Sequence, residues 1–266
     1  MNIIHAFLLG AIQGLTEFLP VSSSAHLILL PKFLQFNDPG LAFDVFLHLG
    51  TLLAVVYFFR KTIWSYVQFI LGSIKSRSLD KTDSRFQELV LLFISFVVTG
   101  VIGFLIKDLA ETRFRSVVVV GWSLLIFSFV MYFADKWGRK ASSIHDMTIL
   151  YAAFIGLFQA MAFIPGISRS GATIVAALLL GLNRSEATRY SFLLSIPVIA
   201  AAGLVEAPKV FVGNVVPAHL LIGFLSATFF GYIAIRLLTW VSKSKSFTPF
   251  VVYRIALAIA VLTLLV

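Results

Sequence analysis

An otherwise apolar chain is interrupted by the stretch Gln13-Gly14-Leu15-Thr16-Glu17-Phe18-Leu19-Pro20-Val21-Ser22-Ser23-Ser24-Ala25-His26. A second polar stretch, Pro165-Gly166-Ile167-Ser168-Arg169-Ser170-Gly171-Ala172-Thr173, interrupts a later apolar region in the same way. Hydroxyl and ionisable groups are costly in hydrocarbon, so groups retained inside such regions indicate a functional site. We therefore expect the fold to be arranged around these two stretches.

The composition predicts an all-α polytopic membrane protein. The chain has 266 residues, of which 59% are hydrophobic and only 12% charged, whereas a soluble domain carries about 25% charged residues. A soluble core could not hide this much apolar surface. A membrane barrel would instead show short segments of alternating hydrophobicity.

The charge balance does not indicate nucleic acid as a partner. The net charge is +9, but cytoplasmic loops rich in Lys and Arg explain this excess in a membrane protein. No run of Lys and Arg is long enough to form a nucleic-acid-binding arm. The sequence holds no cysteine, which excludes disulfides and thiol chemistry. Its first residues lack a basic region, so we expect no cleaved signal peptide.

Apolar runs predict two broken helix pairs and six spanning helices. In the first pair, a helix over residues 3–19 ends at Pro20, and a shorter helix follows from the serines to residue 34. In the second pair, a helix over residues 147–164 ends at Pro165, and a shorter helix covers residues 170–182. The predicted spans are residues 41–59, 89–106, 116–134, 190–205, 218–235 and 250–266. Trp64 and Tyr66 suit the membrane interface, and residues 74–85 form a polar loop.

The two halves of the chain, about 1–140 and 147–266, resemble each other weakly. A shift of 146 residues places Gln13 on Gln159 and residues 21–25 on residues 167–171. Each half would hold one broken pair and three spans in a single membrane domain. Because an odd number of spans inverts the second half, this predicts an inverted-topology repeat.

Lysine and arginine predict the orientation. Fourteen of them fall on the side of the loop over residues 74–85 and five on the other side, which makes the loop side cytoplasmic. Both termini would face outward. If each broken pair is re-entrant, the two polar stretches meet near the middle of the membrane; if each pair spans, they lie on opposite faces. The short second legs favour re-entry, because a span needs about 20 residues.

The first stretch offers acid–base and anion-binding groups. Gln13 and Glu17 share one helical face because they are four residues apart, and Glu17 can bind a divalent cation or accept a proton. Ser22, Ser23 and Ser24 lie at a helix N-terminus, where free N–H groups favour an anion. His26 lies one turn further on, so it can approach a serine hydroxyl or a bound phosphate.

The second stretch repeats this design. Gly166 allows close backbone approach, Ser168 and Ser170 offer hydroxyls, and Arg169 adds a fork suited to phosphate. Together the stretches predict a phosphate or pyrophosphate site at the membrane. The hydroxyl nearest His26 could attack phosphorus, and Arg169 could stabilise the charge that develops.

Both motifs, Gln13-x-x-x-Glu17-Phe-Leu-Pro-Val-Ser-Ser-x-x-His26 and Pro165-Gly-x-Ser-Arg-Ser-Gly-Ala-Thr173, resemble those of the undecaprenyl-diphosphate phosphatase family of the bacitracin-resistance type. The resemblance covers essentially the whole chain. It implies a multi-pass protein of the bacterial plasma membrane that removes one phosphate from undecaprenyl diphosphate. The product, undecaprenyl phosphate, is the carrier lipid of cell-wall synthesis. The resemblance also implies an outward-facing site and a divalent cation, Mg²⁺ or Ca²⁺.

The motif match assigns roles residue by residue. Ser23 would be the nucleophile, His26 its proton partner, Arg169 the phosphate clamp and Glu17 the acid–base or metal-linked carboxylate. Gln13, a neutral residue where the family has Glu or Gln, would join Glu17 at the metal. The expected substrate-binding residues are Ser22, Ser24, Gly166, Ser168, Ser170 and Thr173. Ser24-Ala25 stand where other members have Thr-Gly.

Alternatives stay open at this point. The attacking group could be Ser23, His26 or a metal-bound water. Each serine could be only a helix cap, His26 a packed core residue, Glu17 a partner of the loop backbone and Arg169 a structural bridge.

The broken, inverted helices equally suit a transporter or flippase of a polyprenyl phosphate lipid using the same site. A non-catalytic scaffold is the third reading. The expected partners are a polyprenyl diphosphate lipid, membrane lipids and, as an option, a second copy in a homodimer. Outside the two motifs, we expect Arg254 to snorkel from its span to the interface. Asp44 would cap its helix or line the entrance, and Glu206 would mark an interface; His48 lies in the same span as Asp44.

Overall fold

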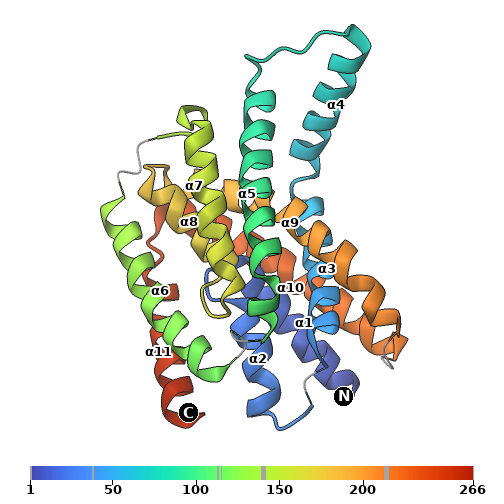
Figure 1. Ribbon diagram of the computed structural model, residues 1–266, viewed down its shortest axis with the longest axis vertical. Coiled ribbons are helices and arrows are strands. Elements are labelled where there is room, and N and C mark those ends of the chain that lie inside the picture. Colours follow the sequence, from blue (N-terminus) through green and yellow to red (C-terminus); the bar gives the residue numbers. More distant parts are fainter. Residues whose placement is uncertain are drawn as a thin grey trace.

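The computed structural model (Figure 1) describes residues 2–37, 39–112, 114, 116–138, 142–212 and 216–265. Its helices are α1 (Ile3–Phe18), α2 (Ser23–Phe33), α3 (Leu41–Phe58), α4 (Arg60–Ser76), α5 (Ser84–Thr112), α6 (Val117–Trp137), α7 (Ile149–Ala160), α8 (Arg169–Leu179), α9 (Arg184–Val212), α10 (Pro217–Ser244) and α11 (Thr248–Leu264), with 3₁₀ turns η1 (Ile144–Asp146) and η2 (Met161–Phe163). The predicted all-α fold is confirmed for these residues, whose one β feature is an isolated bridge between Ser142 and Leu182.

Several helices are long and apolar enough to cross a membrane. Within the described ranges there are four of them: Ser84–Ile106, Val117–Trp137, Arg184–Val205 and Pro217–Lys243. The bent pair Phe43–Phe58 and Arg60–Ser76 would be a fifth if it forms one span. The chain is therefore a multi-pass membrane protein. The helix α11 has 17 residues and is shorter than these four helices. The count of six spans therefore stays a prediction.

Both predicted helix breaks are present. α1 ends just before Pro20 and α7 before Pro165, and proline removes the N–H that would continue a helix. At Gly166 the backbone has a φ of +104°, and a Cβ there would lie 2.0 Å from Oγ of Ser123, so glycine is required. The helices that follow, α2 and α8, have 11 residues each. At about 1.5 Å per residue they cover roughly half of a hydrocarbon core.

The caps of these short helices have the same geometry at the predicted offset. Ser22 caps α2 with a φ of +74°, and Ser168, 146 residues later, caps α8 with a φ of +77°. In both, the Oγ atom accepts the backbone N–H three residues further on. Each Oγ also lies close to the hydroxyl two residues on, 3.2 Å to Ser24 and 3.1 Å to Ser170. Positive φ strains a serine by about 1–3 kcal/mol, so the surrounding structure must hold both caps.

Helices from the two parts of the chain interlock. α1 packs along α10, α7 along α5, α3 against α9 and α6 against α11. A Cβ on Gly10 of α1 would lie 2.3 Å from the carbonyl oxygen of Gly223 of α10, so these two helices approach closely because the residue is small. The interlocked helices bring the breaks of α1–α2 and α7–α8 to the interior.

The two termini lie at the same end of the molecule, the lower end in Figure 1, and the α4–α5 connection lies at the other end. This arrangement agrees with the predicted side of the termini relative to the loop. Which end faces the cytoplasm stays a prediction. Among the residues that entered the charge comparison, Arg113, Arg115, Arg139 and Lys140 lie outside the described residues, as do the side chains of Lys107 and Lys209. The side chain of Glu206, which was expected to mark an interface, also lies outside them.

One expectation is wrong, and one helix was not predicted. The unpredicted helix is α4, because Arg60 and Lys61 at its start indicate the end of the preceding span. Its Tyr66 is buried in the protein, and the place of Tyr66 at the membrane interface stays a prediction. The Tyr66 hydroxyl donates to Oε2 of Glu88 at 2.6 Å, whereas Trp64 is exposed as expected. Arg254 was expected to snorkel, but its side chain is fully buried in the protein interior.

Candidate active site

A cavity of about 180 Å³ opens where the two helix breaks meet. Its lining consists of Glu17, Ser23, Ser24, Val45, His48, Ala162, Ser168, Arg169, Val198, Ile199 and Ala202. The polar members come from α1, the start of α2, α3 and the start of α8. The structure thus brings Glu17 and Ser23 from the first stretch to Ser168 and Arg169 from the second.

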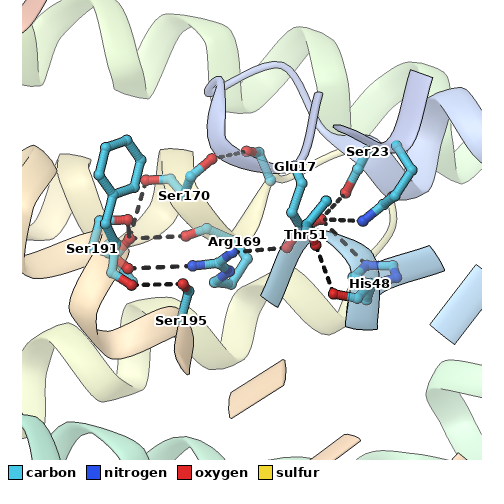
Figure 2. A network of polar contacts seen from close by, with 12 residues as sticks. Glu17, Ser23, His48, Thr51, Arg169, Ser170, Ser191 and Ser195 are labelled. Carbon is cyan, nitrogen blue, oxygen red and sulfur yellow. Dashed lines mark hydrogen bonds and ion pairs between the residues drawn. The ribbon is translucent and has the colours of Figure 1, made fainter. Parts of the chain in front are cut away.

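The carboxylate of Glu17 lies at the centre of this cluster (Figure 2). Its Oε1 atom accepts a bond from Nη2 of Arg169 at 2.8 Å. Its Oε2 atom accepts from Oγ of Ser23 at 2.6 Å and from Nε2 of Gln13 at 3.0 Å. Nε2 of His48 lies 3.2 Å from the same oxygen. A buried carboxylate is costly unless it is paired, and here Arg169 and the surrounding donors pair it.

Ser23 is the first residue of α2, directly after the cap residue Ser22. Its hydroxyl proton points to Glu17, so the oxygen lone pairs are left for the cavity. A hydroxyl becomes a nucleophile when an adjacent base can take its proton. Among the described residues, Glu17 is the group placed to do this.

Arg169 is the first residue of α8 and has a largely buried side chain, 13% exposed. One arm of its guanidinium binds Glu17, and Nη1 donates to the carbonyl oxygen of Ser191 at 3.3 Å. In Figure 2 the guanidinium lies between these two partners. The two hydrogen bonds fix the orientation of the guanidinium. A guanidinium held in this way can present its planar set of N–H donors to a phosphate.

His26 takes part in a different set of contacts. Its Nδ1 donates to the carbonyl oxygen of Ser22 at 2.7 Å, and its Nε2 pairs with the hydroxyl of Tyr253 at 2.6 Å. The two rings stack with centroids 5.7 Å apart. Both nitrogens of His26 are therefore engaged away from the Ser23 hydroxyl, and His26 does not line the cavity. Its catalytic role stays a prediction.

His48 is the site residue that the sequence analysis missed. It projects from α3 into the cavity, with Nδ1 held by the carbonyl oxygen of Asp44 at 2.7 Å and Nε2 at Glu17. An ionisable side chain in an apolar span is itself a signal of function. Its partner could not be identified from sequence, because the contact depends on how α1 packs against α3.

Four of the predicted binding residues are buried in the contacts between the two loops or beneath them: Ser22, Gly166 and Ser170 join the loops, and the Thr173 hydroxyl donates to Oγ of Ser191 on α9 at 2.6 Å. Ser22, Gly166, Ser170 and Thr173 are buried and do not line the cavity. The backbone N–H of Gly166 donates to Oγ of Ser22 at 3.1 Å, and Oγ of Ser170 donates to the carbonyl oxygen of Leu19 at 3.1 Å. Their part in substrate binding stays a prediction, whereas the other two, Ser24 and Ser168, face the cavity.

The two residues predicted to bind a divalent cation, Glu17 and Gln13, are hydrogen-bonded to each other, and Gln13 does not line the cavity, so their metal role stays a prediction. Within the described part of the chain no three His, Cys, Asp or Glu side chains gather around a common point, so there is no all-protein cage. The Oε1 atom of Gln13 is buried and has no hydrogen-bond partner. One carboxylate and one amide oxygen are the hard donors that Mg²⁺ takes when phosphate oxygens and water complete its shell.

Comparison with known proteins places this chain in a family. The family model described as bacitracin resistance protein BacA matches residues 6–260. A protein of Pelobacter propionicus named undecaprenyl-diphosphatase is 42% identical over 270 residues, covering 100% of this chain and 98% of the relative. Relatives with the same name are 43% identical in Rubrobacter xylanophilus (100% and 99% covered) and 41% identical in Methanosphaera stadtmanae (95% and 94%).

Proposed function

The chain belongs to the bacitracin resistance protein BacA family, and from this premise we propose that it is a membrane phosphatase that converts undecaprenyl diphosphate to undecaprenyl phosphate and inorganic phosphate. The observation that carries the proposal is the meeting of the Ser23 hydroxyl, the Glu17 carboxylate and the Arg169 guanidinium in one cavity. A nucleophile, a base and an anion-binding fork are the parts that phosphoryl transfer needs.

In the first step, Oγ of Ser23 attacks the terminal phosphorus of the diphosphate. Its proton passes to Oε2 of Glu17, 2.6 Å away. The bond from the terminal phosphorus to the bridging oxygen breaks, and undecaprenyl phosphate leaves as an anion that needs no added proton. A phosphoserine at Ser23 remains.

Proton arrival at Glu17 also changes what Arg169 binds. A neutral carboxyl group holds the guanidinium less strongly than a carboxylate does. Arg169 then turns its donors to the charge that develops on the transferred phosphoryl group. In the second step water attacks the phosphoserine and the bond from phosphorus to Oγ breaks. Glu17 returns its proton to Oγ of Ser23, and both protons of the water leave with the phosphate as dihydrogen phosphate.

A divalent cation, Mg²⁺ or Ca²⁺, is proposed to accompany the diphosphate. Glu17 and the unpartnered oxygen of Gln13 would hold it together with phosphate oxygens. When bound, it would offset part of the diphosphate charge. His26 is proposed to act through the loop, because its Nδ1 fixes the carbonyl of Ser22, the residue directly before Ser23.

The proposed topology has six spans and two re-entrant pairs in an inverted repeat, with the cavity open to the outside. The 11-residue lengths of α2 and α8 and their matching caps support it. The contact between Glu17 and Arg169 supports re-entry, since spanning pairs would hold the two stretches at opposite faces.

The test is release of inorganic phosphate from undecaprenyl diphosphate by the purified protein in detergent micelles. Formation of undecaprenyl phosphate, followed by mass spectrometry, should match the phosphate released. Folded protein that produces neither would refute the proposal. The transporter alternative predicts lipid movement without hydrolysis. The relatives are named as phosphatases and give this alternative no support.

A further inference from the structure

We propose that Arg254, on the last helix of the chain, is a positioning residue that sets both polar loops and directs the backbone N–H of Ser168 at the substrate's phosphate. We refer to residues 19–22 as the first loop and residues 164–168 as the second loop. The inference rests on the proposed phosphatase function and assigns a role to a residue outside both sequence motifs.

Arg254 binds both loops through their carbonyl oxygens. Its Nη2 donates to Gly166 O at 2.9 Å, and its Nη1 donates to Ile167 O at 3.2 Å and to Pro20 O at 3.4 Å. The side chain is fully buried. One planar fork therefore reaches the first loop and the second loop at the same time.

Helix α6 also holds the guanidinium in place. Nε of Arg254 donates to Oγ of Ser128 at 3.1 Å and Nη2 to the carbonyl oxygen of Leu124 at 3.4 Å, both on α6. The ring of Phe127, on the same helix, lies 5.6 Å from the guanidinium carbon. The loops are thus held against α6 and α11, which pack on each other.

The charge of Arg254 has no carboxylate partner within the described residues; its partners are carbonyls, one hydroxyl and one aromatic ring. An arginine stays protonated in proteins, and a buried charge without a counter-ion is strongly unfavourable. Such a charge would be balanced when an anion occupies the adjacent site. A diphosphate between the loops is an anion of that kind.

The bond to Ile167 O also fixes the direction of a donor. The described peptide bonds are trans, and in a trans peptide the N–H points opposite to the C=O. Because Ile167 O points at Arg254, the N–H of Ser168 points away from it. Ser168 lines the cavity, so its N–H becomes a donor for a phosphate oxygen, strengthened by the charge behind the peptide.

The strained cap of α8 fits this role. Ser168 has a φ of +77°, a conformation that persists only where the surroundings impose it. The residue directly before Ser168 is the one that Arg254 holds. Lysine could not replace this function, because its three donors diverge from a single atom, whereas the arginine fork spreads its donors over a plane.

The test compares Arg254→Lys and Arg254→Met by steady-state kinetics on protein that remains folded in detergent. A misplaced donor costs about 10²-fold in rate. We therefore expect kcat to fall by about 10²-fold in both variants, with KM changed by less than about threefold because the lipid tail still binds. In Arg254→Ala, millimolar guanidinium should restore part of kcat, whereas urea, its neutral analogue, should not.

Arg184→Met is the matched control. Arg184 pairs with Asp135 between α6 and α9 and does not line the cavity, so its loss should lower the melting temperature and leave kcat unchanged. Wild-type kcat in folded Arg254→Lys and Arg254→Met would overturn this inference and leave the phosphatase proposal standing. An inactive wild-type protein would overturn the phosphatase proposal instead. If Arg254→Met does not fold, the kcat of Arg254→Lys decides.

Discussion

Nη2 of Arg169 lies 2.8 Å from Oε1 of Glu17, although 152 residues separate them in the chain. The pair joins the two helix breaks across the cavity (Figure 2). Both side chains are largely buried, 13% and 5% exposed. Glu17 is the carboxylate that pairs with Arg169, and Glu17 itself also has Nε2 of His48 at 3.2 Å. Breaking such a pair on one side typically costs about 3–5 kcal/mol.

We therefore predict that Arg169→Met lowers the free energy of unfolding by about that amount and lowers kcat by about 10²–10³-fold. The double variant Glu17→Gln/Arg169→Met should regain stability, because no lone charge remains buried, but it should stay inactive. Denaturant or thermal unfolding and phosphate release measure the two effects. Equal stability of the single and double variants would contradict the pairing.

Ser23→Ala should remove nearly all activity. If Oγ of Ser23 forms a covalent intermediate, losing it removes one catalytic route, and nucleophile deletions cost about 10⁴–10⁶-fold in kcat. Acid quenching of the wild-type protein with labelled diphosphate should trap phosphoserine. Ser24→Ala is the matched comparison. Ser24 also lines the cavity, but its hydroxyl pairs with Ser22 and not with Glu17, so this variant should lose far less activity than Ser23→Ala. A Ser23→Ala rate within about threefold of wild type would assign the attack to water, with Glu17 as its base.

We predict that His48 supports kcat through its Nε2 atom, which lies 3.2 Å from Oε2 of Glu17. In His48→Gln the side-chain amide can still donate to Oε2, so we expect a loss in kcat of less than about tenfold; in His48→Leu the donor is gone and about 10²-fold is expected. His219→Gln, in a histidine of α10 that does not line the cavity, should leave the rate unchanged. Similar rates for the Gln and Leu variants would show that the hydrogen bond is not what His48 supplies.

Chelation should reduce phosphate release, and the lost activity should return on adding Mg²⁺ or Ca²⁺. Since the cation would take oxygen ligands from Gln13 and Glu17, Gln13→Glu should lower the concentration of cation needed for half-maximal rate, and Gln13→Leu should raise it. Cation titrations of the three proteins measure this. Full activity in excess chelator would remove the cation from the proposal.

The sequence allowed much of this site to be predicted, because its determinants are local. Pro20 and Pro165 each follow the end of an apolar helix, and the serines after them supply the cap of the next helix. The motif match then assigned Glu17, Ser23 and Arg169 to one phosphate site, with His26 as the proton partner of Ser23. These predictions needed only neighbouring residues and one assumption, that both breaks meet inside the membrane.

The remaining parts depend on packing between distant helices. His48 reaches Glu17 only because α3 lies against α1, and no periodicity encodes that contact. Arg254 near a span end reads as a snorkelling residue, yet its face of α11 packs on α6 and turns the guanidinium inward. The helix α4 was missed because Arg60 and Lys61 indicate the end of the preceding span, although residues 62–74 that follow hold no charged side chain. The positions of His48 and Arg254 are set by contacts between helices far apart in the chain, and such contacts cannot be inferred from a single sequence.

His26 provides the last test, because its two proposed roles predict opposite results for its neighbour. As the proton partner of Ser23, His26 would have to leave Tyr253, so Tyr253→Phe should free the ring and leave activity equal or higher. As a residue that holds the Ser22 carbonyl, His26 needs the Tyr253 hydroxyl to keep its ring in place. Tyr253→Phe should then lower kcat by about three- to tenfold, the effect of a small misplacement of Ser23. Tyr232→Phe, in a tyrosine of α10 that does not line the cavity, controls for loss of a hydroxyl. We expect the decrease, because the 2.6 Å contact between His26 and Tyr253 occupies the nitrogen that proton transfer would require.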